Sequence, residues 1–122
     1  MIPAAIIATI LQRDFVAIVI ARPSPDAEPE LVMGPPASLK GRRVLLVDET
    51  CDTGDTIKLA LHAVKGTRPA DVRTAVSFRT GRYQPDFHAF ETAKAIVLPW
   101  DREVVEEGEL VMRPDLRGWL AG

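Results

Sequence analysis

The sequence has little cysteine, little histidine and no excess of positive charge, and each shortage excludes a class of function. Its single cysteine, Cys51, rules out an internal disulfide and a cysteine-based zinc site. The two histidines, His62 and His88, lack the spacing of metal ligands. Fifteen basic and seventeen acidic residues give a net charge of −2, which argues against a nucleic-acid partner.

The sequence also lacks a long hydrophobic run. The longest apolar stretch near its start, Ala4 to Leu11, is far shorter than the roughly 20 residues that a membrane span requires. It has neither the basic leader nor the small-residue cleavage site of a signal peptide. We therefore expect no membrane partner and a location in the reducing cytoplasm. The 122 residues, 47% of them apolar, predict one domain over 1–122 with a small core.

The order of predicted elements indicates an α/β domain with a mostly parallel sheet flanked by helices. Continuous apolar, β-branched runs are typical of strands buried on both faces of such a sheet. The predicted helices are Pro3–Leu11, which is apolar on nearly every face and needs cover on all sides, and about Thr56–Lys65. The predicted strands are Phe15–Ala21, Glu30–Met33 at an edge, Arg43–Val47, Asp71–Phe78 and Lys94–Trp100. The loop Arg79–Phe87 has no helical pattern, and the charged tail after Asp101 is expected to wrap the surface.

The polar loop Asp48–Asp55 is the segment most informative about chemistry. Residues 44–56 read VLLVDETCDTGDT, and in an open parallel sheet ligands bind at the carboxyl ends of strands, where this loop lies. Residues 53–56 lead directly into the next helix, so free backbone N–H groups, the helix dipole and two hydroxyls converge there. We interpret this turn as a pocket for a phosphate monoester.

The two acids at the start of the loop, Asp48 and Glu49, suit another part of a ligand. They leave the strand too early to reach the phosphate, but their carboxylates can accept hydrogen bonds from sugar hydroxyls or from the water shell of Mg²⁺. Taken singly, an acidic pair at a strand end is usually a polar boundary, and Thr-Gly-Asp-Thr is a common start of a helix. As one contiguous unit, they describe a site for a phosphorylated ribose.

This unit resembles the phosphoribosyl pyrophosphate signature of the type I phosphoribosyltransferases. That signature has four apolar residues, two acids, two variable residues, then Asp or Ala followed by Thr-Gly-x-Thr, and residues 44–56 match it throughout. The resemblance implies that Asp48 and Glu49 hold the ribose hydroxyls and, through these or through water, Mg²⁺. It implies that Asp52 is the general base facing N7 of a purine. The residues that it assigns to phosphoribosyl pyrophosphate are Asp48, Glu49, Asp52, Thr53, Gly54, Asp55 and Thr56.

Further matches resemble the 6-oxopurine enzymes of the xanthine-guanine and hypoxanthine-guanine type. Residues 85–87 (PDF) and 98–101 (LPWD) look like their Pro-Asp-Phe/Tyr and Pro-Trp-Asp/Glu elements. Arg79 stands near the place of the family's lysine that meets the purine O6, and a guanidinium can also donate to a carbonyl. A solvated arginine at a strand end is the alternative. The resemblance assigns base binding to Arg79, Ile96 and Asp101.

Two departures from the family pattern bear on activity. Ala95 stands where the family usually has an aromatic residue that stacks on the base, a role that Phe78, Tyr83 or Phe90 could take from elsewhere. The first residues of the chain resemble those that follow the family's glycine pair. The domain would then be shortened at its N-terminus, without one strand and the pyrophosphate-binding loop. Cys51, at a variable position of the signature, is expected to be a small filler rather than a nucleophile.

These features predict a purine phosphoribosyltransferase of nucleotide salvage, with low activity in this short form. It would use Mg²⁺ and bind phosphoribosyl pyrophosphate and a purine base or a nucleoside monophosphate. Two alternatives stay open: a non-catalytic module that binds phosphoribosyl pyrophosphate or a nucleotide and regulates a partner, and an incomplete reading frame of an ordinary enzyme. We also expect a homodimer or larger assembly, because the helix Pro3–Leu11 needs cover.

Overall fold

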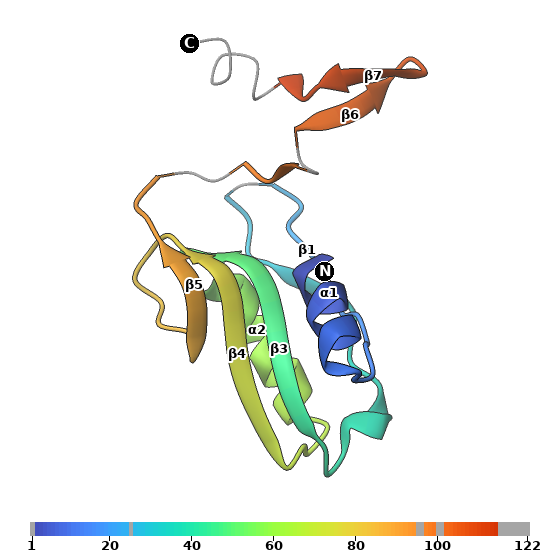
Figure 1. The fold of residues 1–122 in the computed structure, drawn as a ribbon, viewed down its shortest axis with the longest axis vertical. Coiled ribbons are helices and arrows are strands. Elements are labelled where there is room, and N and C mark those ends of the chain that lie inside the picture. Colours follow the sequence, from blue (N-terminus) through green and yellow to red (C-terminus); the bar gives the residue numbers. More distant parts are fainter. Residues whose placement is uncertain (1, 25, 95–96, 100–101, 115–122) are drawn as a thin grey trace.

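The computed structural model describes residues 2–24, 26–94, 97–99 and 102–114. The described elements follow one another as two helices and seven strands, with one short 3-10 helix at Ala37–Leu39 (Figure 1). The helices are α1 (Ile2–Leu11) and α2 (Asp55–Lys65). The strands are β1 (Val19–Ala21), β2 (Glu30–Met33), β3 (Arg43–Cys51), β4 (Asp71–Arg79), β5 (Phe87–Glu91), β6 (Glu103–Glu106) and β7 (Glu109–Met112).

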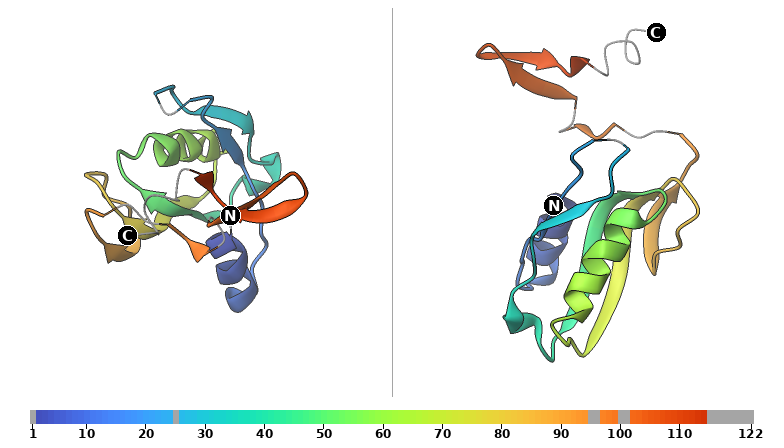
Figure 2. Two further views of the ribbon diagram at one scale, coloured as in Figure 1. Left: turned by 90° about the horizontal axis from the view of Figure 1, so that it is seen from above. Right: turned by 180° about the vertical axis from the view of Figure 1, so that it is seen from behind.

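Three parallel strands in the order β3-β4-β5 form the sheet that carries the candidate site. β3 and β4 pair along their whole length, from Arg43 opposite Asp71 to Cys51 opposite Arg79. The sheet has α2 on one face and α1 on the other, as the view from above in Figure 2 shows. Such cover on both faces explains the apolar run Val44–Val47 within β3. The predicted fold class, a parallel sheet flanked by helices, is confirmed.

Helix α2 follows the sequence prediction to within one residue. It starts after Gly54 and ends before Gly66, whose N–H donates to the carbonyl of His62 at 3.1 Å. Its buried residues, Ile57, Ala60 and Val64, recur at helical spacing and turn toward β3 and β4. The amphipathic pattern therefore fixes which face of the helix meets the sheet.

The core between α2 and the sheet is small. Cys51, Ile57 and Val76 are each 2–4% exposed and pack together, with Leu46 and Tyr83 against them. Full burial of side chains such as Ile57 or Val76 stabilises a fold by about 1.5–3 kcal/mol each. The expectation that Cys51 is a small filler is confirmed. Because Tyr83 lies in the loop after β4, the core extends directly to that loop.

The N-terminal part differs from the prediction. Only Val19–Ala21 of the predicted strand Phe15–Ala21 is strand, and it pairs antiparallel with β2 in a separate two-stranded sheet. Phe15 and Val16 are exposed, so the run is not buried on both faces. β-branched residues favour extension, but burial also requires a neighbouring strand, and within the described residues β3 pairs with β4 alone.

Helix α1 forms as predicted but is not covered on all sides. It packs against β3 and has no buried residue. Ile6 and Ile10 are 53% and 73% exposed. None of the helices among the described residues is long and apolar enough to cross a membrane.

The last part of the chain differs most from the prediction. Strand β5 lies at Phe87–Glu91, directly after the predicted loop, while the described residues in Lys94–Trp100 are not strand. All residues of β5 are exposed, and its sequence, FHAFE, has no continuous apolar run that would predict a buried strand. After Asp101, β6 and β7 form an antiparallel hairpin, which extends away from the sheet instead of wrapping it (Figure 1).

Candidate functional site

The predicted site lies at the carboxyl end of β3, where the chain passes into α2. β3 continues to Cys51, four residues beyond the predicted end at Val47, so Asp48 and Glu49 belong to the strand and not to the loop. Strand pairing with β4 continues there because Asp48 is opposite Val76. Neighbouring strand residues project to opposite faces, so these two half-buried carboxylates leave β3 on opposite sides.

The oxygen donors of this pair suit magnesium. Asp48 Oδ1 accepts a hydrogen bond from the Glu49 N–H at 2.8 Å, which leaves its second oxygen for other partners. Among the residues that the structure describes, no three His, Cys, Asp or Glu side chains gather into a metal cage. Mg²⁺ is usually held by one or two carboxylates together with water and substrate oxygens. The donor set fits that mode and not an all-protein cage.

A tight turn, residues 52–54, joins β3 to α2. Gly54 is buried and has a φ of 88°, a conformation that side-chain-bearing residues rarely adopt. The Asp55 N–H donates to Thr53 Oγ1 at 3.3 Å, and the first helical bond runs from the Lys58 N–H to the Gly54 carbonyl at 2.8 Å. The N–H groups that precede Lys58 in the first turn, those of residues 55–57, have no partner within the helix. Helix start, glycine and exposed Thr53 together can bind a phosphate.

The loop between β4 and β5 packs on this turn, whereas the sequence indicated only one residue of this loop, Tyr83, as an alternative stacking partner of the base. The Tyr83 N–H donates to the Asp52 carbonyl at 3.3 Å, and the Thr80 N–H donates to the Cys51 carbonyl at 2.8 Å. A Cβ on Gly54 would lie 2.5 Å from the ring of Tyr83. Residues 52–54 and 80–83 therefore form one packed unit, which we call the double loop.

Gly81 is a residue of the same loop that sequence reasoning missed. A Cβ at this position would collide with the carboxylate Oδ1 and the backbone carbonyl of Asp52. The Asp52 side chain therefore lies directly against the backbone of Gly81, while Asp52 as a whole is exposed. The only signal in the sequence was a glycine in a polar loop, and nothing there indicated its neighbour.

Arg79 is bonded to the double loop and to β5. Its Nε donates to the Tyr83 carbonyl at 2.8 Å, its Nη2 to the Arg82 carbonyl at 3.2 Å, and its Nη1 pairs with Glu91 Oε1 at 3.0 Å. Its side chain is 17% exposed. Three of the five guanidinium N–H groups thus have protein partners, and a contact with a purine would use the other two.

Two ionisable groups at the double loop, the Cys51 thiol and the Tyr83 phenol, are held in their neutral forms. Burial raises the pKa of the Cys51 thiol, and the charges of Asp48 and Asp52 raise it further. Burial also raises the pKa of the Tyr83 phenol. At pH 7 the thiol is therefore a poor nucleophile, because the thiolate is the reactive form.

The Pro-Asp-Phe element holds the end of the same loop. Pro85 is fully buried. Asp86 Oδ2 accepts hydrogen bonds from the N–H and the hydroxyl of Thr74 at 2.8 and 3.1 Å, and the Asp86 N–H donates back to Thr74 Oγ1 at 2.9 Å. The bond from the Thr74 N–H is the main reason that the pKa of Asp86 lies below its usual range. These bonds fix the loop where β5 begins.

The base-binding side is described only in part. Ile96 and Asp101, both predicted to contact the base, lie outside the described residues, and so does Ala95. Phe78 and Phe90 stack on one another with ring centroids 5.5 Å apart, and Phe90 is 63% exposed. Phe78, Tyr83 and Phe90 are the candidate stacking partners of the base. Of these, Phe78 and Phe90 form a stacked pair near the ends of β4 and β5.

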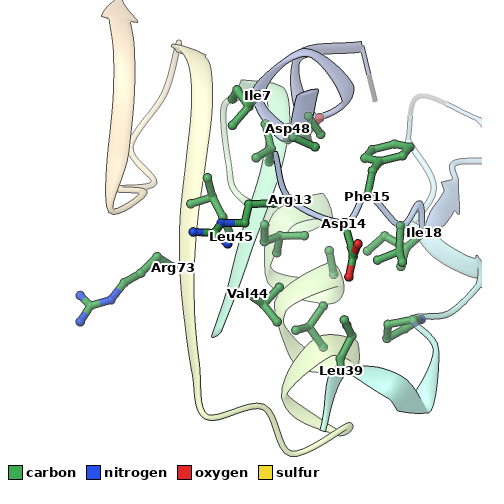
Figure 3. A pocket seen from close by; sticks show the side chains of 18 of the residues that line it. Ile7, Arg13, Asp14, Phe15, Ile18, Leu39, Val44, Leu45, Asp48 and Arg73 are labelled. Atoms are coloured by element: carbon green, nitrogen blue, oxygen red, sulfur yellow. The ribbon is translucent and has the colours of Figure 1, made fainter. Parts of the chain in front are cut away.

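A large groove lies beside β3, away from the turn at Gly54. Its volume is about 870 Å³, and it runs between α1, the segment before β1, β3 and α2 (Figure 3). Most of its lining is apolar and includes Ile7, Phe15, Ile18, Leu39, Val44 and Leu45. Asp48 and Thr56 line both the groove and the candidate site.

The family comparison agrees with this geometry. Residues 1–110 match the model of the phosphoribosyl transferase domain. The purine phosphoribosyltransferase from Pyrococcus horikoshii OT3 is 28% identical, with a TM-score of 0.76 over 89% of this chain and 75% of that chain. No curated protein sequence matches the chain.

A second solved structure is similar in fold. It is a variant of the hypoxanthine phosphoribosyltransferase from Trypanosoma cruzi in complex with the product IMP. The identity is 19% and the TM-score 0.58, over 86% of this chain and 60% of that chain. The chain thus spans three fifths of the length of this more distant relative.

Proposed function

The chain belongs to the phosphoribosyl transferase domain family, and from this premise we propose that it transfers phosphoribose from phosphoribosyl pyrophosphate to N9 of a 6-oxopurine. Pyrophosphate is the leaving group. The observation that carries the proposal is the turn 52–54, which presents Asp52 and the start of α2 side by side at the carboxyl end of a parallel strand.

The 5′-phosphate binds at residues 53–56. Gly54 allows the tight turn at a φ of 88°, and the start of α2 supplies N–H donors and about half a positive charge. Asp55 stabilises the helix start through the same dipole and competes with the phosphate. Lys58 brings a positive charge close to the turn, because its Nζ lies 5.5 Å from the centre of the Tyr83 ring, which itself packs on Gly54.

The ribose hydroxyls bind Asp48 and Glu49, which also hold Mg²⁺ through water or those hydroxyls. Mg²⁺ would neutralise the charge that develops on the diphosphate as it departs. Asp52 takes or shares the proton of the purine at N7. The backbone of Gly81 lies against the Asp52 carboxylate and orients it for this role. The Tyr83 N–H donates to the backbone carbonyl of Asp52 and holds it in place.

The family resemblance assigns base recognition to Arg79, Ile96 and Asp101. The purine class is supported by the family signature and by the similarity to the purine phosphoribosyltransferase of Pyrococcus horikoshii. Ala95 stands where the family usually has an aromatic residue, and Phe78 and Phe90 offer a stacking surface in its place. Stacking of this kind is worth about 1–3 kcal/mol per base in nucleic-acid complexes. We also propose a cytoplasmic location and a homodimer.

A second candidate function is a module that binds phosphoribosyl pyrophosphate or a nucleotide without turnover. It is favoured by Ala95, which cannot stack on the base. Weaker binding of the base affects transfer more than it affects binding of the phosphoribose. In that case Asp52 would remain as part of the fold of the double loop.

Parallel binding and turnover measurements test both candidates. Calorimetric titration with ribose 5-phosphate and IMP measures binding, and formation of nucleotide from phosphoribosyl pyrophosphate, Mg²⁺ and hypoxanthine, guanine or xanthine measures turnover. Binding with turnover supports the transferase, and binding without turnover supports the module. If neither ribose 5-phosphate nor IMP binds, both proposals are wrong.

A further inference from the structure

Arg79 connects three parts of the molecule. It is the last residue of β4 and is paired in register with Glu91, the last residue of β5. Its ion pair with Glu91 therefore joins the two strand ends. Its two other protein-bonded N–H groups reach the carbonyls of Arg82 and Tyr83 in the double loop. A planar guanidinium can make these bonds together, whereas a lysine ammonium lacks the fork geometry.

Tyr83 passes this anchoring on to the candidate site. Its carbonyl accepts the bond from Arg79, its N–H donates to the Asp52 carbonyl, and its ring lies against Gly54. Tyr83 thus accepts a bond from the guanidinium and also contacts Asp52, the proposed general base, and the phosphate turn at Gly54. Among the described residues, Arg79 is the one donor to the Tyr83 carbonyl. Loss of this bond would therefore loosen the double loop.

Glu91 keeps the guanidinium in place. Its Oε1 pairs with Arg79, and its Oε2 lies 3.8 Å from His88 Nε2. Both are on β5, which is itself fixed by the bonds between Asp86 and Thr74. Glu91 therefore holds the guanidinium from β5, while the other two bonded N–H groups of Arg79 donate to the loop carbonyls.

We propose that Arg79 is a positioning residue, which holds Tyr83 and Gly81 against Asp52 and Gly54 and so shapes the phosphoribose half of the site. This inference rests on the proposed function, since it concerns the same site. It departs from the role that the family resemblance gives Arg79, which is to read the purine O6.

Three ligands distinguish the two roles. Ribose 5-phosphate probes the phosphoribose half alone, while IMP and AMP share a phosphoribose and differ at the purine 6-position. For a positioning role, Arg79→Lys and Arg79→Gln weaken ribose 5-phosphate and IMP by a similar factor of about ten, and the ratio of IMP to AMP affinity stays that of the wild type. If ribose 5-phosphate binding is unchanged and the IMP to AMP ratio falls, Arg79 reads the base and the inference is overturned.

A spectroscopic signature separates positioning from general loss of stability. In the ligand-free protein, Arg79→Lys should shift the ¹H–¹⁵N resonances of residues 52–55 and 80–83 and leave those of the amino ends of β3 and β4 in place. Glu91→Gln removes the ion pair but keeps the loop bonds, so the same ligands should weaken about threefold in the same pattern. If Arg79→Gln does not fold, Arg79→Lys and Glu91→Gln decide, because Glu91 is 62% exposed.

Arg73→Gln is the matched control. Arg73 is on the same strand and pairs with Asp71 at 3.2 Å, but both side chains are mostly exposed and lie at the far end of β4 from the site. This variant should bind all three ligands as the wild type does. Unchanged affinities in Arg79→Lys and Glu91→Gln would overturn the positioning role. Failure of the wild type to bind ribose 5-phosphate and IMP would instead contradict the proposed function.

Discussion

Gly54 is the residue at which the phosphate turn, the helix start and the second loop meet. Its φ of 88° costs any residue with a side chain about 1–2 kcal/mol, and the ring of Tyr83 occupies the space that a Cβ would need. We expect Gly54→Ala to lower the free energy of unfolding by about 2–4 kcal/mol and to weaken ribose 5-phosphate binding at least tenfold. Urea unfolding and calorimetry measure the two effects.

Gly41 provides the control for that substitution. It has a similar φ of 73°, but a Cβ there would meet nothing within 4 Å. Gly41→Ala should therefore cost only the backbone strain, about 1–2 kcal/mol, and leave ligand binding unchanged. Equal losses of stability and equal binding in the two variants would mean that the contact between Gly54 and Tyr83 is unimportant.

Asp52 can be tested with an isosteric change. Asp52→Asn keeps the shape that fits against Gly81 but removes the proton acceptor. General base catalysis typically contributes about 10²–10⁴ in rate. We therefore expect nucleotide formation to fall by about that factor, with ribose 5-phosphate binding within about twofold of the wild type. Steady-state assays with hypoxanthine or guanine measure it, and an unchanged rate would exclude Asp52 as the base.

Among the structural elements, the connection from β4 to β5 is unusual. Parallel strands are normally joined by a crossover of a dozen or more residues, often a helix. Here residues 80–86 are enough, because β5 begins opposite Ala75, in the middle of β4. The bonds between Asp86 and Thr74 hold the returning chain at that level. The same short connection keeps Tyr83 over the turn at Gly54.

The pH dependence of stability tests the anchor at Asp86. Its pKa is lower in the folded protein than in the unfolded chain, so below about pH 4 the unfolded chain binds more protons. The stabilisation from Asp86 is present above that range and is lost as the pH falls through the folded pKa. Asp86→Asn should be less stable than the wild type at pH 6, and this difference should shrink toward pH 3. Urea unfolding between pH 3 and 6 measures it, and a constant difference would contradict the anchor.

The elements that could be predicted from sequence are those with a local pattern. β3 has the apolar run Val44–Val47, β4 alternates exposed and buried residues over its first half, and α2 has buried residues at helical spacing and glycine at each end. β5 could not be predicted, because all its side chains are exposed and its place depends on pairing with β4. Phe15 to Ile18 have a strand-like composition but no partner strand, and composition alone does not supply one.

The site divides in the same way. Asp48, Glu49 and residues 52–56 are contiguous, so a motif could identify them. Gly81 and Tyr83 reach Asp52 and Gly54 from nearly thirty residues away, so no local pattern connects them. Arg79 donates to backbone carbonyls, which every residue has, so no sequence pattern indicates these bonds.

For the whole molecule, the exposed side of α1 leads to a prediction about assembly. Ile2, Ile6 and Ile10 are spaced four residues apart and are 40–73% exposed, so they form an apolar stripe. Monomeric proteins seldom leave such surface open to water. We expect a homodimer in sedimentation experiments at micromolar concentration, and a monomer for the double variant Ile6→Glu with Ile10→Glu.

The hairpin offers the control for this prediction. Val105 on β6 is also apolar and 69% exposed, but it lies far from α1 (Figure 1). Val105→Glu should leave the sedimentation coefficient of the dimer unchanged. A wild-type chain that sediments as a monomer would contradict the role assigned to the α1 stripe.

The one-sided pairing of β3 has a consequence for amide hydrogen exchange. In a parallel pair, every second residue directs both its N–H and its carbonyl to the same neighbour, and the residues between them face the other way. Within the described residues β3 has β4 on one side and the apolar groove on the other. Deuterium should therefore enter β3 in alternation, with slow amides toward β4 and fast amides toward the groove. A strand that lies between two helices would then exchange, at every second position, as if it were at the surface.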